Sequence, residues 1–173
     1  MSGWPATRRA MAADRAALAA HLDAGGAREA LWLQPAHVAV RLYRLSHYLH
    51  AAGWRRGARL LWFAGIALTG ADLDPAAEIG PGVLIPSPHS VTIRGRIGAG
   101  CRLGAQVGIG WRMPEGCQDL PVLADGVEVG PGTLILGPVR VGARARIGPR
   151  CLVTADVPED ARVSPLDWRG VKL

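Results

Sequence analysis

The apolar positions of this chain follow two different periods, one in each half. In residues 1–70 they recur at spacings near 3.6, which is typical of amphipathic α-helices. This pattern predicts three helices, over residues 6–22, from Pro35 to Gly53 and over residues 54–68. Gly70 follows the last apolar position of the third helix and closes the helical half.

From residue 71 the period changes to six, and it holds over thirteen aliphatic positions. They are Leu73, Ile79, Ile85, Val91, Ile97, Leu103 and Ile109, then, after one interruption, Leu123, Val129, Ile135, Val141, Ile147 and Val153. Glycine follows seven of them, at corners where a Cβ would strain the backbone. This is the hexapeptide repeat of a parallel β-helix, in which each six residues form one short strand and one turn. We therefore expect stacked coils with the aliphatic side chains inside.

A second inward position lies four residues after each aliphatic, and it is usually small. The residues there are Ala77, Val83, Cys101, Val107, Val127, Thr133, Val139, Ala145, Cys151 and Val157. Two of the three cysteines occupy this position, and we interpret Cys101 and Cys151 as small buried hydrophobes. The same spacing puts His89 in an inward slot, as one large polar side chain among small ones.

The repeat is interrupted once, between Ile109 and Leu123, where 14 residues stand in place of six. The eight extra residues predict a loop over residues 110–122, and such insertions usually lie on the functional face of a solenoid. The candidates for substrate contact in this loop are Trp111, Arg112, Cys117 and Asp119. Two interpretations of Cys117 stay open, a nucleophile with a lowered pKa or an exposed thiol without a role.

Composition and charge disfavour several classes of protein. Residues 1–70 hold nine Arg against three acidic residues, which accounts for the net charge of +6. No run of Lys or Arg exceeds two, so solvated helix faces are favoured over nucleic-acid binding. The longest apolar stretch, Leu60 to Thr69, is too short to span a bilayer, and it would either lie on a membrane surface or pack as a helix.

The cysteine content favours a reducing compartment. Three cysteines give an odd number, and none of them forms a CxxC or another metal-binding spacing. Charged residues interrupt the N-terminal segment, which therefore lacks the apolar core of a signal peptide. We expect a cytoplasmic protein without a bound metal.

Several segments together carry a resemblance to a known family. The helical leader, the segment ADLDPAAEIGPG from Ala71, the repeats with one long loop and the ending TADVPEDARV resemble the serine O-acetyltransferases. They also resemble the acetyltransferases of capsule and exopolysaccharide synthesis, and the likeness covers about residues 30–165. The resemblance implies a left-handed parallel β-helix over residues 71–165, preceded by a helical domain over residues 1–70 and followed by a short tail over residues 166–173.

The resemblance also implies a chemistry. It implies a homotrimer that uses acetyl-CoA or another acyl-CoA as co-substrate and a small molecule as acceptor. The acyl chain would lie in a groove between subunits, under the long loop. A histidine would take the proton of the acceptor hydroxyl, oriented by a carboxylate.

This chain departs from the family at the catalytic positions. The position of the orienting carboxylate falls on Asp72, but that of the catalytic histidine falls on Ser87, and the loop's Arg-His pair falls on Asp119 and Leu120. His89 is either a displaced base or substrate contact, or a histidine packed inside the coil. Ser87 either binds an acceptor or is inert, and Asp72 is either functional or a cap of the first coil.

The positions expected to bind the acyl-CoA donor depart less from the family pattern. The late-coil positions where the family binds CoA are Gly132, Thr133, Ala145, Arg146 and Arg150. The arginines would either meet phosphates or be solvated on outward strand positions. The expected function is therefore an acyl-CoA-dependent acyltransferase with an acceptor other than serine. The alternative is a non-catalytic homologue that binds a ligand or a partner enzyme, because both histidines that the resemblance implies are absent. Serine acetyltransferases bind cysteine synthase through their C-terminal tail.

Overall fold

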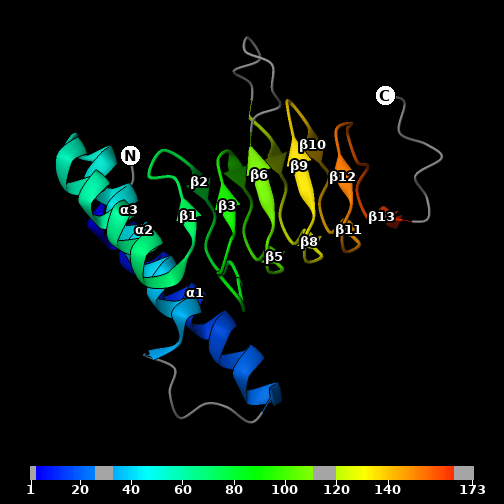
Figure 1. The fold of residues 1–173 in the computed structure, drawn as a ribbon. Coiled ribbons are helices and arrows are strands. Elements are labelled where there is room, and N and C mark those ends of the chain that lie inside the picture. Colours follow the sequence, from blue (N-terminus) through cyan, green and yellow to red (C-terminus); the bar gives the residue numbers. More distant parts are fainter. Residues whose placement is uncertain (1–2, 26–32, 111–119, 166–173) are drawn as a thin grey trace.

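The protein consists of three helices followed by a solenoid of short strands (Figure 1). The structure is a computed structural model, and it describes residues 3–25, 33–110 and 120–165. The helices are α1 (Trp4–Gly25), α2 (Pro35–Ala51) and α3 (Arg55–Thr69). All three predicted helices are confirmed, and α1 extends the predicted range 6–22 at both ends. No helix in these ranges is both long and apolar enough to cross a membrane.

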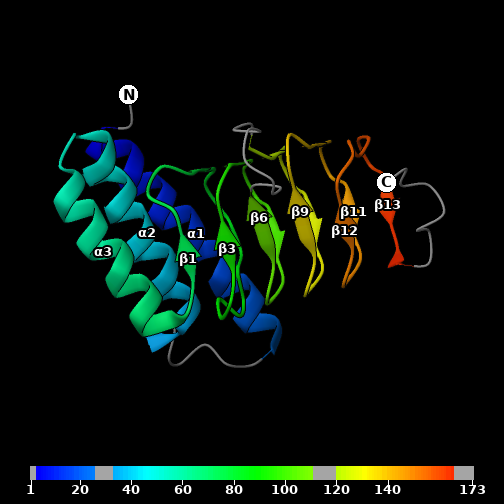
Figure 2. The same ribbon diagram turned by 45° about the horizontal axis from the view of Figure 1, so that its top comes forward.

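The solenoid is built from thirteen strands in the described residues, and all pairings are parallel. The strands are β1 (Asp72–Leu73), β2 (Glu78–Ile79), β3 (Thr92–Ile93), β4 (Arg96–Ile97), β5 (Arg102–Leu103), β6 (Gly108–Gly110), β7 (Val122–Leu123), β8 (Glu128–Val129), β9 (Leu134–Leu136), β10 (Arg140–Val141), β11 (Arg146–Ile147), β12 (Leu152–Val153) and β13 (Arg162–Val163). They form three sheets: sheet A (β1, β3, β6, β9, β12), sheet B (β2, β4, β7, β10) and sheet C (β5, β8, β11, β13). The expected left-handed parallel β-helix is confirmed. Figure 2 shows the helices side by side at one end of it.

The interior of the β-helix contains the aliphatic column that the six-residue pattern predicts. Leu103, Ile109 and Ile135 are almost completely buried, since each points inward from its strand. Both cysteines of the small inward column, Cys101 and Cys151, are buried as expected. Burial raises the pKa of the Cys101 thiol, which disfavours the reactive thiolate.

The six-residue period slips in the first full coil, and this corrects the predicted register. Leu73 pairs with Ile93, and Ile79 pairs with Ile97. The corner from Ile85 to Ile93 is therefore two residues longer than the repeat, and the corner from Ile93 to Ile97 is two shorter. Ile93, not Val91, occupies the main aliphatic column, although both are buried.

The longer corner corrects the expected position of His89. Val91 fills the small inward slot, two positions before Ile93, and its N–H closes a turn onto the carbonyl of Pro88. His89 lies on this turn and is exposed. The expectation that it points into the coil is wrong, because the two added residues carry it around the corner to the surface.

The loop insertion leaves the stacking intact. On either side of it, Ile97 pairs with Leu123 and Ile109 pairs with Ile135, so the coils resume in phase. The loop candidates Trp111, Arg112, Cys117 and Asp119 lie outside the described residues. Gly110 and Leu120, which flank them, lie where the chain passes from sheet A to sheet B.

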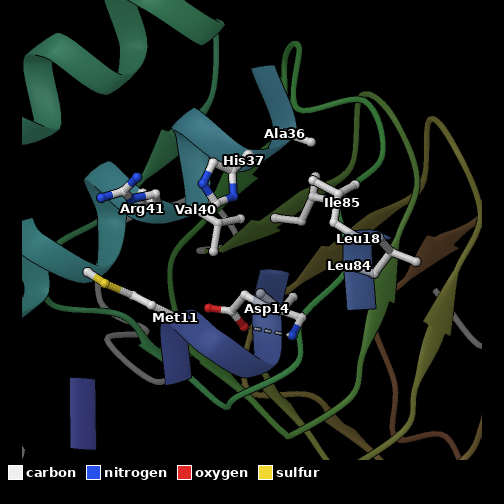
Figure 3. Close-up of a pocket in the computed structure, with 10 residues that line it drawn as sticks. Met11, Asp14, Leu18, Ala36, His37, Val40, Arg41, Leu84 and Ile85 are labelled. Atoms are coloured by element: carbon white, nitrogen blue, oxygen red, sulfur yellow. Dashed lines mark hydrogen bonds between the residues drawn. The ribbon is translucent and has the colours of Figure 1, made fainter. Parts of the chain in front are cut away.

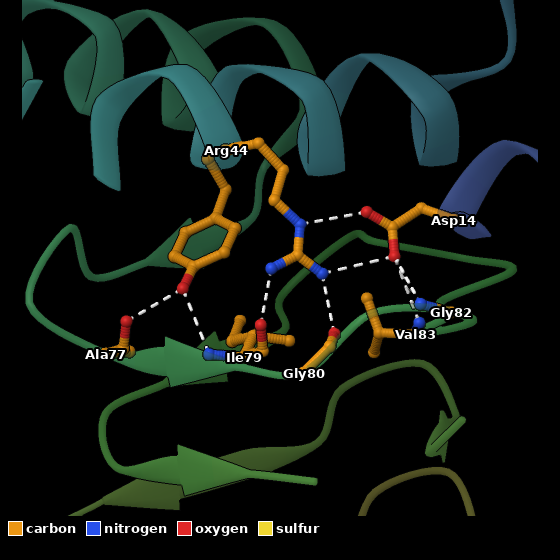
Figure 4. A network of polar contacts seen from close by, with 8 residues as sticks. Asp14, Arg44, Ala77, Ile79, Gly80, Gly82 and Val83 are labelled. Carbon is orange, nitrogen blue, oxygen red and sulfur yellow. Dashed lines mark hydrogen bonds and ion pairs between the residues drawn. The ribbon is translucent and has the colours of Figure 1, made fainter. Parts of the chain in front are cut away.

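A buried ion pair joins the helices to the first coil (Figure 4). Arg44 on α2 donates to both carboxylate oxygens of Asp14 on α1, at 2.9 and 3.1 Å. Two further N–H groups, on Nη1 and Nη2, donate to the carbonyls of Ile79 and Gly80. In turn, Asp14 accepts the backbone N–H groups of Gly82 and Val83 at 2.8 and 3.1 Å. These bonds satisfy backbone groups at the open end of the solenoid.

Tyr43 adds a second connection between α2 and the same coil. Its hydroxyl donates to the carbonyl of Ala77 at 2.7 Å and accepts the N–H of Ile79 at 3.1 Å. Burial raises the pKa of Tyr43 to about 12, because the phenolate would lose its hydration. The helices therefore cover this end of the solenoid, and their polar side chains bind the backbone of its first coil.

Candidate functional site

The turns that lead from sheet C to sheet A form one continuous edge, which we call the C–A edge. It consists of residues 86–90, 104–106, 130–132 and 148–150. Each turn has one residue with positive φ: Ser90 at 56°, Gln106 at 58°, Gly132 at 70° and Arg150 at 56°. Backbone bonds connect successive turns, from Gln106 to His89 at 3.3 Å, from Gly132 to Ala105 at 2.9 Å and from Arg150 to Pro131 at 2.9 Å.

The C–A edge brings together candidates that are far apart in the sequence. Ser87 and His89 lie on its first turn, and Gly132 and Arg150 lie on its third and fourth turns. Two of the expected catalytic residues and two of the expected CoA-binding residues therefore share one line along the solenoid. The sequence places them on repeats, but only the pairing of the coils puts them on the same edge.

The imidazole of His89 lies against Gly70. A Cβ added to Gly70 would lie 2.7 Å from Nδ1 of His89, so a larger residue there would displace the ring. Gly70 ends α3 in a left-handed conformation with a φ of 70°, and its carbonyl accepts the N–H of Ser90 at 2.9 Å. The ring makes no hydrogen bond with the described residues, which leaves both nitrogens available to a ligand.

The carboxylate of Asp72 is held by groups other than His89. Nε1 of Trp62, on α3, donates to one oxygen at 2.8 Å, and Arg94 donates to the other at 3.4 Å. The same guanidinium lies 3.9 Å from Asp74. Asp74 also caps the first turn, since its Oδ1 accepts the N–H of Ala76 at 2.8 Å. Asp72 is thus part of a polar cluster on sheet A, two residues from Gly70.

Sequence reasoning missed two members of this cluster. Trp62 carries no sequence signal, because its contact with Asp72 depends on how α3 lies against β1. Arg94 carries a weak one. It follows the aliphatic Ile93, where most repeats of this chain have glycine.

A groove of about 500 Å³ runs over the outward face of sheet C. Ser87 lies at the groove, and Arg146 lines it from β11. The outward residues of this sheet are stacked in register: Arg102, Glu128, Arg146 and Arg162. Arg146 lies 3.6 Å from Glu128 in an exposed ion pair, which is weak and leaves the guanidinium able to bind an anion.

Two of the expected CoA-binding residues lie inside the coil. Thr133 and Ala145 are completely buried, and the hydroxyl of Thr133 donates to Gly148 at 2.8 Å and accepts the N–H of Cys151 at 3.2 Å. Any contact of these two residues with a cofactor would be made by the backbone. Gly132 and Arg150 remain at the surface, and Cγ of Arg150 lies 3.4 Å from a Cβ placed on Gly132.

The small cavity between α1, α2 and the first coil does not fit a ligand. Figure 3 shows Met11, His37 and Val40 around it, and its free volume is about 10 Å³, roughly one water position. Burial, and then the charges of Arg41 and Arg15, lower the pKa of His37. Within the described ranges, no group of three or more His, Cys, Asp or Glu residues could hold a metal ion.

Solved structures similar to this one are serine acetyltransferases. The soybean enzyme in complex with serine superposes with a TM-score of 0.85 at 28% identity, over 93% of this chain and 68% of that one. This chain has the fold of the hexapeptide-repeat acyltransferases. The Entamoeba histolytica serine acetyltransferase 1 with L-cysteine matches with a TM-score of 0.81 at 28% identity, over 93% of this chain and 64% of that one.

A third serine acetyltransferase, from Neisseria gonorrhoeae, matches with a TM-score of 0.81 at 26% identity, over 90% of this chain and 62% of its own. The acyltransferase fold is thus shared over nearly all of this chain, which spans less than two thirds of the Entamoeba and Neisseria enzymes. The sequence matches no family model, and no curated protein matches it either.

Proposed function

We propose that this protein is an acyl-CoA-dependent acyltransferase whose acceptor is not serine. The observation that carries the proposal is the C–A edge, which aligns Ser87 and His89 with Gly132 and Arg150 on an acetyltransferase fold. Neighbouring coils lie about 4.8 Å apart, so His89 and Arg150, three coils apart, are separated by roughly 14 Å along the edge. That span suits an acyl thioester at one end and the phosphates of CoA at the other.

The reaction needs one base and one electrophile. A nitrogen of His89 would take the proton of an acceptor hydroxyl or amine as the acceptor atom bonds to the thioester carbonyl carbon. The carbon–sulfur bond then breaks, and the CoA thiolate leaves with the proton that the imidazolium returns. Gly70 supports this role, because it leaves space for the ring at the surface.

The acceptor would meet a site that differs from that of the serine enzymes. Ser87 stands at the expected position of the catalytic histidine, and the carboxylate of Asp72 is engaged by Trp62 and Arg94. In place of a carboxylate–histidine pair, the chain offers a mixed-charge cluster beside an unpaired imidazole. These substitutions favour an acceptor without the amino-acid head group of serine.

The complete site would be formed between copies of the chain. Gly110 and Leu120, at the base of the loop, lie between sheets A and B, whereas His89 lies between sheets C and A. In one chain the base of the loop and the imidazole therefore lie on different edges. In a homotrimer, the loop of one copy would approach the C–A edge of the next and bring the loop and the imidazole together. We propose that this trimer is cytoplasmic.

The alternative is a non-catalytic homologue that binds a ligand or a partner enzyme. The observation in its favour is that no described carboxylate orients His89, while Ser87 and Leu120 stand where the family has histidines. In that case the groove on sheet C would bind CoA without turnover, or the segment over residues 166–173 would bind a partner.

The experiment that separates these functions combines binding and turnover. Calorimetry with acetyl-CoA measures affinity, and release of free thiol with a panel of amines and alcohols, serine included, measures transfer. We expect His89→Gln to lower turnover by about 10²–10⁴-fold with little change in affinity, as for loss of a general base. His50→Gln, on α2, is the matched control and should leave both unchanged. Binding of CoA without thiol release by any acceptor would favour the non-catalytic alternative. Absence of binding would refute the acyltransferase and CoA binding in the groove on sheet C.

A further inference from the structure

Helix α3 buries small residues and exposes several of its bulky apolar residues. Its buried residues are Gly57, which lies under the ring of Trp54, and Ala58, Gly65 and Thr69, and the helix packs against α2. The large apolar side chains are exposed: Trp54 at the N-cap by 62%, Leu60 by 72%, Phe63 by 67% and Leu68 by 70%. We call these four residues the outer face of α3. A helix in a monomeric globular protein has the reverse arrangement.

Two members of the outer face lie in one line along the helix. Arg56, Leu60, Phe63 and Ala67 are spaced by four, three and four residues, which puts Leu60 and Phe63 on one side of it. The ring of Trp54 lies over Gly57 on the first turn. A Cβ on Gly57 would lie 2.7 Å from the indole, so the missing side chain lets the ring rest on the first turn. The face thus presents an indole, a phenyl ring and two leucines.

The charged side chains of α3 have one sign. The helix contains three arginines, Arg55, Arg56 and Arg59, and no acidic residue. All three arginines lie exposed on its first turns, beside Trp54. A surface that supplies negative charge next to an apolar medium would therefore complement this helix.

We propose that the outer face of α3 binds the surface of an anionic lipid bilayer, with the helix lying in the plane of the interface. An apolar face with Trp, Phe and Leu, flanked by arginines, is the pattern of interfacial helices. The indole would lie at the level of the headgroups, and the arginines would meet lipid phosphates. This inference does not depend on whether the protein catalyses acyl transfer.

A second copy that meets this face with its own α3 fits less well. Two α3 helices placed face to face would bring six arginines into one contact with no acidic residue from either helix to pair with them. A stable protein interface also takes about 800 Å² and some 20–30 residues from each partner. The face of one 15-residue helix is smaller than that. An anionic lipid surface supplies negative charge to the arginines, and it can bind the face of a single helix.

The test is co-sedimentation of the full chain with vesicles. We expect binding to vesicles of equal parts phosphatidylcholine and phosphatidylglycerol, little binding to phosphatidylcholine alone, and a loss of binding at high salt. Leu60→Ser with Phe63→Ser should reduce binding at least tenfold. Leu152→Ser, which changes a half-exposed leucine of β12, is the matched control and should bind as the unchanged protein does.

A second variant and a second measurement complete the test. Reversal of Arg55, Arg56 and Arg59 to Glu should reduce binding to the anionic vesicles by about 100-fold, at roughly tenfold or less per charge. Sedimentation equilibrium measures the mass of each variant. The proposal fails if the unchanged protein does not bind anionic vesicles or if the Leu60/Phe63 variant binds as well. It also fails if that variant has a lower mass than the unchanged protein, since a second copy would then cover the face.

Discussion

The carboxylate of Asp14 and the guanidinium of Arg44 form an ion pair in a buried site, with 7% and 6% of their side chains exposed. Both groups also bind backbone atoms of residues 79–83. Each charge is therefore stabilised by the opposite charge and by backbone hydrogen bonds. This arrangement locks α1 and α2 onto the end of the solenoid. An unpaired charge left in such a place is costly.

Removal of one partner should therefore be more destabilising than its size suggests. We expect Arg44→Met to lower the free energy of unfolding by about 3–5 kcal/mol, because Asp14 then remains buried without its cation. Urea unfolding followed by circular dichroism measures this change. Glu128→Gln, in the exposed pair with Arg146, is the control and should change stability by less than about 1 kcal/mol. Equal losses in both variants would contradict the role assigned to the buried pair.

The hydroxyl of Tyr43 predicts a decline of stability at alkaline pH. The pKa of Tyr43 is raised to about 12 in the folded protein, against 10.0 ordinarily, so the folded state holds the proton more tightly. Its contribution is complete below about pH 10 and is lost as the pH rises through 12. Tyr43→Phe should cost about 1–3 kcal/mol at neutral pH, since Ala77 and Ile79 lose their partner. It should also flatten the decline between pH 10 and 12. A decline of the same steepness in the variant would show that another group causes it.

The contact between Gly70 and His89 predicts that a single methyl group disturbs the candidate base. Gly70→Ala adds a Cβ 2.7 Å from the imidazole and requires a positive φ that alanine tolerates poorly. We expect about 1 kcal/mol of destabilisation and a shifted C2-proton resonance of His89 in the NMR spectrum. Gly53→Ala is the control, because Gly53 has a φ of 83° but nothing within 4 Å of its added Cβ. The ring contact is refuted if both variants leave the His89 resonance in place.

Substitutions of Thr133 and Arg150 should have different effects, one on stability and the other on the affinity for CoA. Thr133→Val removes a buried hydroxyl with two hydrogen bonds, so we expect a loss of about 1–3 kcal/mol of stability and an unchanged affinity for CoA. Arg150→Ala should leave stability nearly unchanged and weaken CoA binding at least tenfold, since its guanidinium is exposed on the C–A edge. Calorimetry and urea unfolding on both variants measure the two effects. The reverse outcome would remove Arg150 from the proposed cofactor site.

Much of the candidate site could be located from the sequence, but not its geometry. The repeats identify the coils that carry Ser87, Gly132 and Arg150, because the six-residue spacing assigns each to a turn. They misplace His89, because one corner of its coil has two added residues and the next has two fewer. The two changes cancel, so the aliphatic residues still recur every six positions. The pairing of Leu73 with Ile93 reveals the shift.

The sequence by itself determined the fold class, since aliphatics every six residues with glycine at the corners can bury their side chains together only in stacked coils. It also determined that three helices precede them. The tertiary structure alone decided which polar groups meet. Asp14 and Arg44 are 30 residues apart, and Trp62 reaches Asp72 only because α3 lies against β1. Hydrophobic periods report which face of an element is inside, whereas these contacts depend on how separate elements are placed against one another.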